Sequence, residues 1–361
     1  MFLFYLSERE QLLLSFLLII DAGIDYVSFP SFIFLQFLVV FLFLKFLRVG
    51  FLCNQGMQVI CLIILLWVVV ASGQSDLAAL LELKKGFVKD PSGKVLVSWI
   101  SKSSDSNGCP LNWYGITCSS NNHVTSITLN DVGLVGEFSF SAISGLSMLT
   151  NLSISNNQFT GTISMIGSIQ SLQYLDVSGN MFRGSIPSAL FNLNNLVYLN
   201  LSSNQFEGKA GAGFGKLEKL KYLDLQANGF SGDIMQLLSQ IGSVVHVDLS
   251  SNQFSGSLDL GLGSTSFISS IQYLNISHNS LVGEPFAHDG LPFLDSLEVF
   301  DASHNQLAGS VPSFSFVVSI RVLRLGSNQF TGSLPEALIQ ESSMVLSELD
   351  LSLNQLKGIF I

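Results

Sequence analysis

The chain has 361 residues, of which 12% are charged and 48% are hydrophobic, and its formal net charge is −10. A disordered chain combines high charge with few apolar residues, so this composition excludes one. The acidic balance also argues against a nucleic-acid partner, because phosphate backbones are bound by basic surfaces.

The first 73 residues are strongly apolar. Residues 57–73 combine an apolar run with a small-residue triplet, Ala71-Ser72-Gly73, which is typical of a signal peptide and its cleavage site. The alternative is a buried core helix. Residues 1–56 contain a further apolar stretch at 32–44, and two interpretations stay open for them: an extension upstream of a true start at Met57, or a membrane anchor.

Cysteine usage agrees with export from the cytosol. Cys53 and Cys61 lie in the apolar leader, so Cys109 and Cys118 are the only pair in the rest of the chain. In an oxidising compartment such a pair predicts a disulfide. A metal site is not predicted, because a zinc centre needs more ligands than two cysteines. No cofactor is predicted either.

From residue 124 onward the chain repeats one template, L-x-x-L-x-L-x-x-N-x-φ-x-G, in which φ is Phe or Leu. A leading copy carries Val132 in place of the Asn. Such self-similarity is the signature of a repeat architecture. We expect about ten copies within residues 121–361, the last of them truncated. The template Asn occurs at Asn157, Asn180, Asn204, Asn228, Asn252, Asn279, Asn305, Asn328 and Asn354.

The spacing predicts an α/β fold, a right-handed solenoid with short parallel strands on its concave face. Within each copy the pattern x-L-x-L-x has a period of two, so two apolar side chains point inward from a short strand. One copy cannot bury its own apolar face, and stacking of neighbours provides the core. We expect the template Asn to satisfy backbone groups of the turn, the Phe or Leu to form an internal column, and the Gly to permit a tight turn.

Two outward positions of the strands are candidate binding features. Five consecutive copies place an aromatic ring at the same position: Tyr174, Tyr198, Tyr222, His246 and Tyr273. Aligned strands would turn these rings into a stripe that binds a ligand, or the rings pack only on one another. Two positions later the chain carries mostly Asp or Asn, which indicates either an acidic groove or solvated residues that bond to local loops.

Three sequons predict N-glycosylation in a secreted chain, at Asn151, Asn200 and Asn275. All three lie at outward strand positions. Glycans at Asn200 and Asn275 would flank the aromatic stripe and restrict what docks there.

Residues 74–120 differ from the repeats and are predicted to cap the first of them. Ser75-Asp76 begins an amphipathic helix, and Trp99 and Trp113 supply apolar bulk. Together with the segment Cys109-Pro-Leu-Asn-Trp-Tyr-Gly-Ile-Thr-Cys118, these residues resemble the N-terminal cap of plant extracellular leucine-rich-repeat proteins. Tails of the form L-x-G-x-[IVL]-P, as at Ile186-Pro187, resemble the plant-specific repeat.

The resemblance is to ectodomains of plant receptor-like serine/threonine kinases, including members with inactive kinases. It implies a cell-surface module, outside the plasma membrane, that recognises a peptide or a co-receptor ectodomain and is not itself an enzyme. It also implies membrane association, through the N-terminal apolar segment or a helix beyond residue 361, and the last repeat is predicted to lack a cap. The alternative from another class is a secreted inhibitor of a pathogen cell-wall hydrolase built on the same repeat.

Overall fold

The computed structural model describes residues 75–100, 108–110, 112–260, 270–285, 296–311, 319–334 and 345–358. Residues 74–361 form one compact unit. The segments predicted at 1–56 and 57–73 lie outside the described residues. Among those that are described, no helix has the length and apolar character needed to span a membrane.

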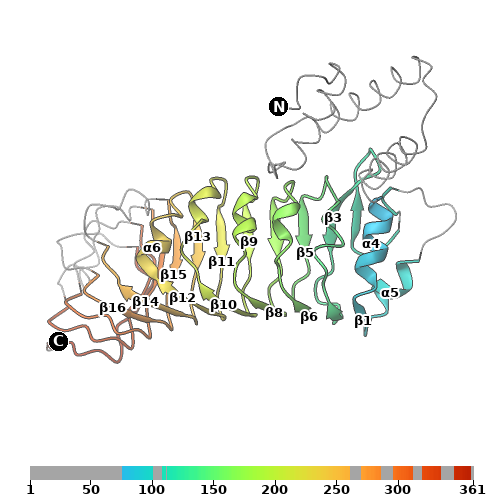
Figure 1. The fold of residues 1–361 in the computed structure, drawn as a ribbon. Coiled ribbons are helices and arrows are strands. Elements are labelled where there is room, and N and C mark those ends of the chain that lie inside the picture. The colour runs from blue at the N-terminus through green and yellow to red at the C-terminus, as the bar shows by residue number, and fades with distance from the viewer. Residues whose placement is uncertain are drawn as a thin grey trace, which may run out of the picture. The chain divides into compact units, whose positions relative to one another are not determined.

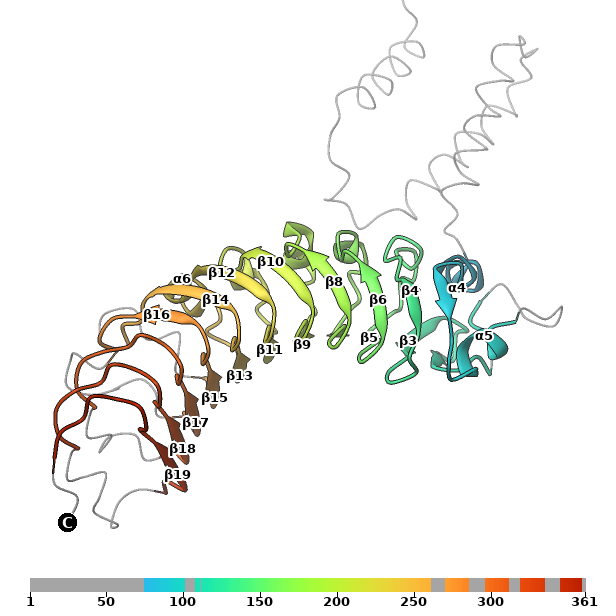
Figure 2. The same ribbon diagram turned by 90° about the horizontal axis from the view of Figure 1, so that it is seen from below.

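The predicted parallel solenoid is confirmed. Each copy contributes a short strand to an eleven-stranded sheet that follows the concave side of the repeat array (Figures 1 and 2). Only β2 pairs in the antiparallel sense in this sheet. The strands are β2 Ile116–Cys118, β3 Val124–Thr128, β5 Asn151–Ser153, β7 Tyr174–Asp176, β9 Tyr198–Asn200, β11 Tyr222–Asp224, β13 His246–Asp248, β15 Tyr273–Asn275, β17 Val299–Asp301, β18 Val322–Arg324 and β19 Glu348–Asp350.

A second sheet of eight strands lies on the other side of the array. Its strands are β1 Phe87–Lys89, β4 Val135–Glu137, β6 Gln158–Gly161, β8 Met181–Gly184, β10 Gln205–Lys209, β12 Gly229–Asp233, β14 Gln253–Ser257 and β16 Ser280–Val282. Apart from β1, which belongs to the cap, they begin at or near the template Phe or Leu. The glycine two residues further on has positive φ, for example 90° at Gly208, one residue before the end of β10. The positive φ confirms that the position favours glycine, but in β6, β8, β10, β12 and β14 this residue lies within the strand and not in a tight turn.

The core lies between the two sheets and follows the template. The inward leucines of the copies before the last are buried, as are Phe159, Phe182, Phe206, Phe230, Phe254 and Phe330 of the predicted column, whereas Leu349 of the last copy is 39% exposed. The rings of Phe182, Phe206 and Phe230 stack in sequence, with centroids 6.3 and 6.0 Å apart. Where leucine replaces phenylalanine, Leu281 and Leu307 are equally buried, whereas Leu356 is partly exposed. In the last described repeat, Leu353 is 77% exposed.

The template asparagines link each repeat to the one before it. Nδ2 of Asn228 lies 3.2 and 3.1 Å from the carbonyl oxygens of Leu225 and Gln226, and 3.0 Å from that of Leu201 in the preceding repeat. Its Oδ1 accepts a hydrogen bond of 3.0 Å from the backbone N–H of Phe206. The same arrangement recurs from Asn157 to Asn354. The predicted role of the Asn is therefore confirmed, and it extends across the repeat boundary.

The N-terminal cap closes the array at its first repeat. Helix α4, Asp76–Lys84, begins at Ser75, whose hydroxyl accepts a hydrogen bond from the N–H of Ala78. Short helix α5, Lys94–Ser98, leads to Trp99, which is fully buried and stacks on Trp113 at 5.2 Å. The repeats also contain the short helix α6, Ile234–Leu238, and 3₁₀ helices at Ile166–Ser168, Ser188–Asn192 and Phe214–Lys216.

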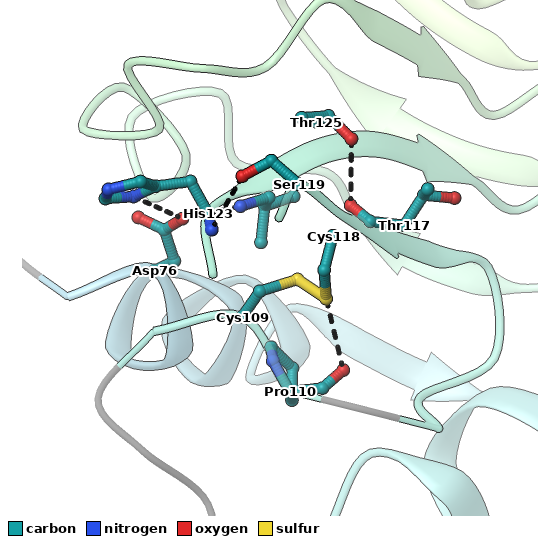
Figure 3. Close-up of a disulfide and its surroundings, with 9 residues drawn as sticks. Asp76, Cys109, Pro110, Thr117, Cys118, Ser119, His123 and Thr125 are labelled. Atoms are coloured by element: carbon teal, nitrogen blue, oxygen red, sulfur yellow. Dashed lines mark hydrogen bonds and ion pairs between the residues drawn. A yellow bond between two sulfur atoms is a disulfide. The ribbon is translucent and has the colours of Figure 1, made fainter. Parts of the chain in front are cut away.

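The predicted disulfide joins Cys109 to Cys118, with Cα atoms 5.7 Å apart (Figure 3). Beside it, Oδ2 of Asp76 accepts a 2.6 Å hydrogen bond from the N–H of Val124 and lies 3.4 Å from Nδ1 of His123. The disulfide holds the strand β2 segment, and Asp76 ties helix α4 to the first strand of the array. The disulfide is thus internal to the cap, and the cap is joined to the first repeat by the pairing of β2 with β3 and by the hydrogen bond from Val124 to Asp76.

We expect Asn228→Ala to lower the free energy of unfolding by about 2–4 kcal/mol, because carbonyl oxygens of two repeats and one N–H lose their partner away from water. Chemical denaturation followed by circular dichroism measures the loss. The control is Asn194→Ala, at an exposed position outside the template. Equal stability of the two variants would contradict the role of Asn228.

Replacing both disulfide cysteines by serine should lower stability by about 2–3 kcal/mol, the value that loop-closure entropy gives for a ring of this size. Thiol labelling of the folded, secreted protein should find neither Cys109 nor Cys118 free. Labelling at both positions without reductant would show that the bond does not form.

Candidate functional site

The five predicted aromatic side chains form one continuous stack on the concave sheet, which we call the ring column: Tyr174, Tyr198, Tyr222, His246 and Tyr273. Strand register places them side by side. Successive ring centroids are 4.1, 4.2, 4.3 and 4.1 Å apart, and the planes of neighbours differ by 6–10°. Asn151 precedes the column in register and Val299 follows it.

The stacking decides which atoms the ring column offers to a partner. All five residues are half-buried. Both faces of Tyr198, Tyr222 and His246 are covered by neighbouring rings, so ring edges and polar atoms remain for contact. Burial raises the pKa of the Tyr174 and Tyr222 hydroxyls, and each lies within hydrogen-bond reach of Tyr198. These phenols therefore stay protonated and can donate hydrogen bonds.

Histidine replaces tyrosine at one place in the stack. Burial lowers the pKa of His246, while the nearby carboxylate of Asp248 opposes that shift. The imidazole is therefore uncharged at neutral pH, and it stacks as a neutral ring between Tyr222 and Tyr273. Packing of the rings on one another, one of the two readings of the stripe, is confirmed. Ligand binding by the five residues stays a prediction.

Two residues beyond the ring column stands a row of acidic and amide side chains, which we call the Asx column: Asp176, Asn200, Asp224, Asp248, Asn275 and Asp301. In five of the six, Oδ1 accepts hydrogen bonds from both the N–H and the hydroxyl of a serine two residues further along. At Asp248 these bonds measure 2.9 and 2.6 Å.

The expectation that these carboxylates are solvated is wrong. Asp176, Asp224, Asp248 and Asp301 are only 7–8% exposed. The position is the last of its strand, and Oδ1 bonds to the loop that follows, where a serine supplies the donors at Asp176, Asp248 and Asp301. The reading of local bonding is confirmed, and an acidic groove open to a basic ligand is not what this face presents.

The Asx column also contains two of the three predicted glycosylation sites. Oδ1 of Asn200 and of Asn275 accepts from Ser202 and Ser277, and Nδ2 of Asn275 donates to Asp248 over 3.0 Å. Asn200 is only 9% exposed. Asn151 differs, because it lies in register with the ring column. Glycosylation at all three stays a prediction, and burial together with the bond to Ser202 leaves the side chain of Asn200 little exposed.

Sequence reasoning missed two clusters in the later repeats. Arg324 takes the Asx position, where its guanidinium binds Glu348 through two contacts of 2.6 and 2.9 Å and approaches Asp301 at 3.4 Å. His278 and His304 stack at 4.1 Å in the turns of adjacent repeats. Gly326 replaces the usual serine after Arg324, which was a visible signal, since arginine cannot accept the serine hydrogen bonds.

Comparison with known proteins bears on the architecture. Residues 74–119 match a family model described as leucine rich repeat N-terminal domain, and residues 170–230 and 319–340 match leucine rich repeat models. The solenoid is built of leucine-rich repeats. This leucine-rich-repeat chain is 46% identical over 101 residues to the LRR receptor-like serine/threonine-protein kinase GHR1 of Arabidopsis thaliana. That match covers 28% of this chain and 10% of the kinase.

Solved structures with the same fold include two proteins of different function. One is the ectodomain of the Arabidopsis thaliana receptor kinase GASSHO1/SCHENGEN3 in complex with CASPARIAN STRIP INTEGRITY FACTOR 2, with TM-score 0.68, 27% identity, and coverage of 77% of this chain and 33% of that chain. The other is a plant ice-binding protein, with TM-score 0.65, 27% identity, and coverage of 79% and 87%. The leucine-rich-repeat chain spans a small part of the receptor kinases that it matches.

Tyr222→Ala should lower the free energy of unfolding by about 1–3 kcal/mol, because it removes two stacked contacts, each with about 0.5–1.5 kcal/mol beyond burial of area. Tyr222→Phe keeps the ring and should cost less than about 1 kcal/mol. Thermal and chemical denaturation of both variants checks this. A destabilisation by alanine that is no greater than that by phenylalanine would mean that stacking does not hold the column.

Proposed function

We propose that this chain is the extracellular recognition module of a plant receptor-like kinase and that the ring column is the centre of its binding surface for a peptide or protein. The main observation in support of this proposal is the continuous stack of five rings on the concave sheet. Support also comes from relatives named as receptor kinases and from structural neighbours that are receptor ectodomains in complex with peptides or co-receptors.

The chemistry of the ring column favours a partner rich in hydrogen-bond acceptors. Aromatic rings are negative on their faces and positive at their edges, and here the faces of the inner rings are covered. The exposed edges and the phenol hydroxyls therefore attract carbonyl and carboxylate oxygens. A polypeptide offers one carbonyl oxygen per residue, and tyrosine contributes large contact area at little entropic cost. Ring spacings near 4.2 Å repeat this opportunity along the sheet.

The surroundings leave the column accessible from one side. The position before each ring carries Gln173, Val197, Lys221, Val245 and Gln272, of which Val197 is 39% exposed. The proposal places these residues at the rim of the interface. It also places the module outside the cell, with the predicted signal peptide at 57–73, glycans at the sequons, and membrane attachment outside the described residues. A co-receptor ectodomain is a second class of protein partner for the same face.

The partner can be captured from the proposed surface. A photo-crosslinking amino acid at Val197, in the full chain expressed in plant cells, should link to an extracellular peptide or ectodomain that mass spectrometry identifies. The matched control carries the crosslinker at Ser255, an exposed position of the second sheet. Equal capture from both positions would overturn the proposed surface, and capture of a secreted glycan hydrolase would support the inhibitor function instead.

With the captured partner, Tyr198→Phe combined with Tyr222→Phe should weaken binding about tenfold, because two hydroxyl donors are lost while both rings remain stacked. Val197→Arg should weaken it further by occupying the rim, whereas Ser255→Arg should leave affinity unchanged. Affinity measured by calorimetry and melting temperature measured on the same samples separate binding from packing. Unchanged affinity in the double phenylalanine variant and in Val197→Arg would remove the ring column from the interface.

A further inference from the structure

Asp224 is the exception in the Asx column. Each of the other five members accepts from a serine hydroxyl two residues along, but residue 226 is glutamine, so at this place in the loop Asp224 accepts from the N–H of Gln226, over 3.0 Å, and from no hydroxyl. The hydroxyl of Ser202 in the preceding repeat is also within reach. That hydroxyl has one proton, and it donates to Oδ1 of Asn200 at 2.7 Å. Asp224 is therefore a buried carboxylate that lacks a donor its equivalents possess.

The neighbours of Asp224 add to the cost of its charge. Strand register sets it directly beside Asp248 on β13 and beside uncharged Asn200 on β9. Asp248 is satisfied by four donors, from Ser250, Tyr273 and Asn275. Besides Asp248, the ionisable residues on the described strands around Asp224 are Tyr198, Tyr222 and His246. Asp176 lies one strand further away. None of them is a cation at neutral pH, since burial lowers the pKa of His246.

We propose that Asp224 is a proton-binding site of the concave face, and that its protonation tightens the repeats that carry the centre of the ring column. In the neutral form the carboxyl group no longer repels Asp248, and its hydroxyl becomes a donor in a region that already holds several acceptors. This change stabilises the pairing of strands β11 and β13, which carry Tyr222 and His246. The proposal does not depend on the proposed function, because it concerns the stability of the free protein.

The sign of the effect follows from linkage between proton binding and folding. Burial, with the neighbouring carboxylates of Asp248 and Asp176, raises the pKa of Asp224 from 3.8 to about 6 in the folded protein. A carboxyl group with a raised folded-state pKa destabilises the fold above that pKa, and the penalty disappears as pH falls below the unfolded-state value. The contribution of Asp224 to stability therefore improves between about pH 7 and pH 4.

The test compares the secreted protein with its Asp224→Asn variant between pH 7.5 and 4. Asn occurs naturally in this column at positions 200 and 275, and the substitution creates no sequon because residue 226 is glutamine. At pH 7.5 the equilibrium constant for unfolding of the variant should be up to about a hundredfold smaller than that of the unsubstituted protein, because the pKa of Asp224 differs by about two units between the folded and unfolded states. The difference in melting temperature between the two proteins should shrink to a small part of its value by pH 4, close to the unfolded-state pKa. A difference that persists unchanged at pH 4 would overturn the proposal.

Two further variants separate the site from general charge effects. Asp131→Asn removes one negative charge at an exposed position, so a pH-dependent gain of equal size there would assign the effect to net charge and overturn the proposal. Gln226→Ser restores the missing hydroxyl donor while Asp224 remains. It should stabilise the protein at pH 7.5 and flatten the pH dependence, whereas an unchanged profile would contradict the proposal. The Gln226→Ser variant also tests the proposal if Asp224→Asn fails to fold.

Discussion

The structure depends on one interaction, the side-chain amide of the template asparagine, which binds backbone groups of two repeats at once. A solenoid must change chain direction several times per turn while its interior stays apolar, so each turn brings carbonyl oxygens toward a core that offers no water. Nδ2 of Asn180, Asn204 and Asn228 donates to these oxygens, and Oδ1 of each accepts a hydrogen bond from the N–H of a core phenylalanine. Leucine packing provides the driving force, while the amides keep neighbouring repeats in register.

The template made most of this predictable. Positions such as Leu199, Phe206 and Asn228 repeat at nearly constant spacing, and a period shared by many copies admits only stacked, parallel units. The ring column was predictable for the same reason, since equal offsets within aligned strands place the rings side by side. The disulfide followed from the pair of cysteines outside the apolar leader, in a chain predicted to be exported.

Burial of the Asx column was not predictable from strand periodicity. Alternation places Asp224 on the outward face, but a strand of three residues ends there, and the side chain bonds to the loop that follows and is only 8% exposed. Asp224 lacks a hydroxyl donor because residue 226 is glutamine and because the hydroxyl of Ser202, in another repeat, donates elsewhere. The second of these facts cannot be seen in the sequence of one copy. The His278 and His304 stack likewise arises only when two turns with positive φ are placed side by side.

The bond between an Asx side chain and the serine two residues later has a consequence for how extracellular repeats acquire sugars. An asparagine at that position, followed two residues later by the serine that the turn requires, is already an acceptor motif for glycosylation, as at Asn200 and Asn275. The aspartates at 176, 248, 301 and 350 also precede such a serine. A single Asp-to-Asn mutation would create a new sequon at any of them. Local backbone chemistry thus supplies glycan acceptor motifs by mutation alone, at positions that are buried or half-buried in the folded protein.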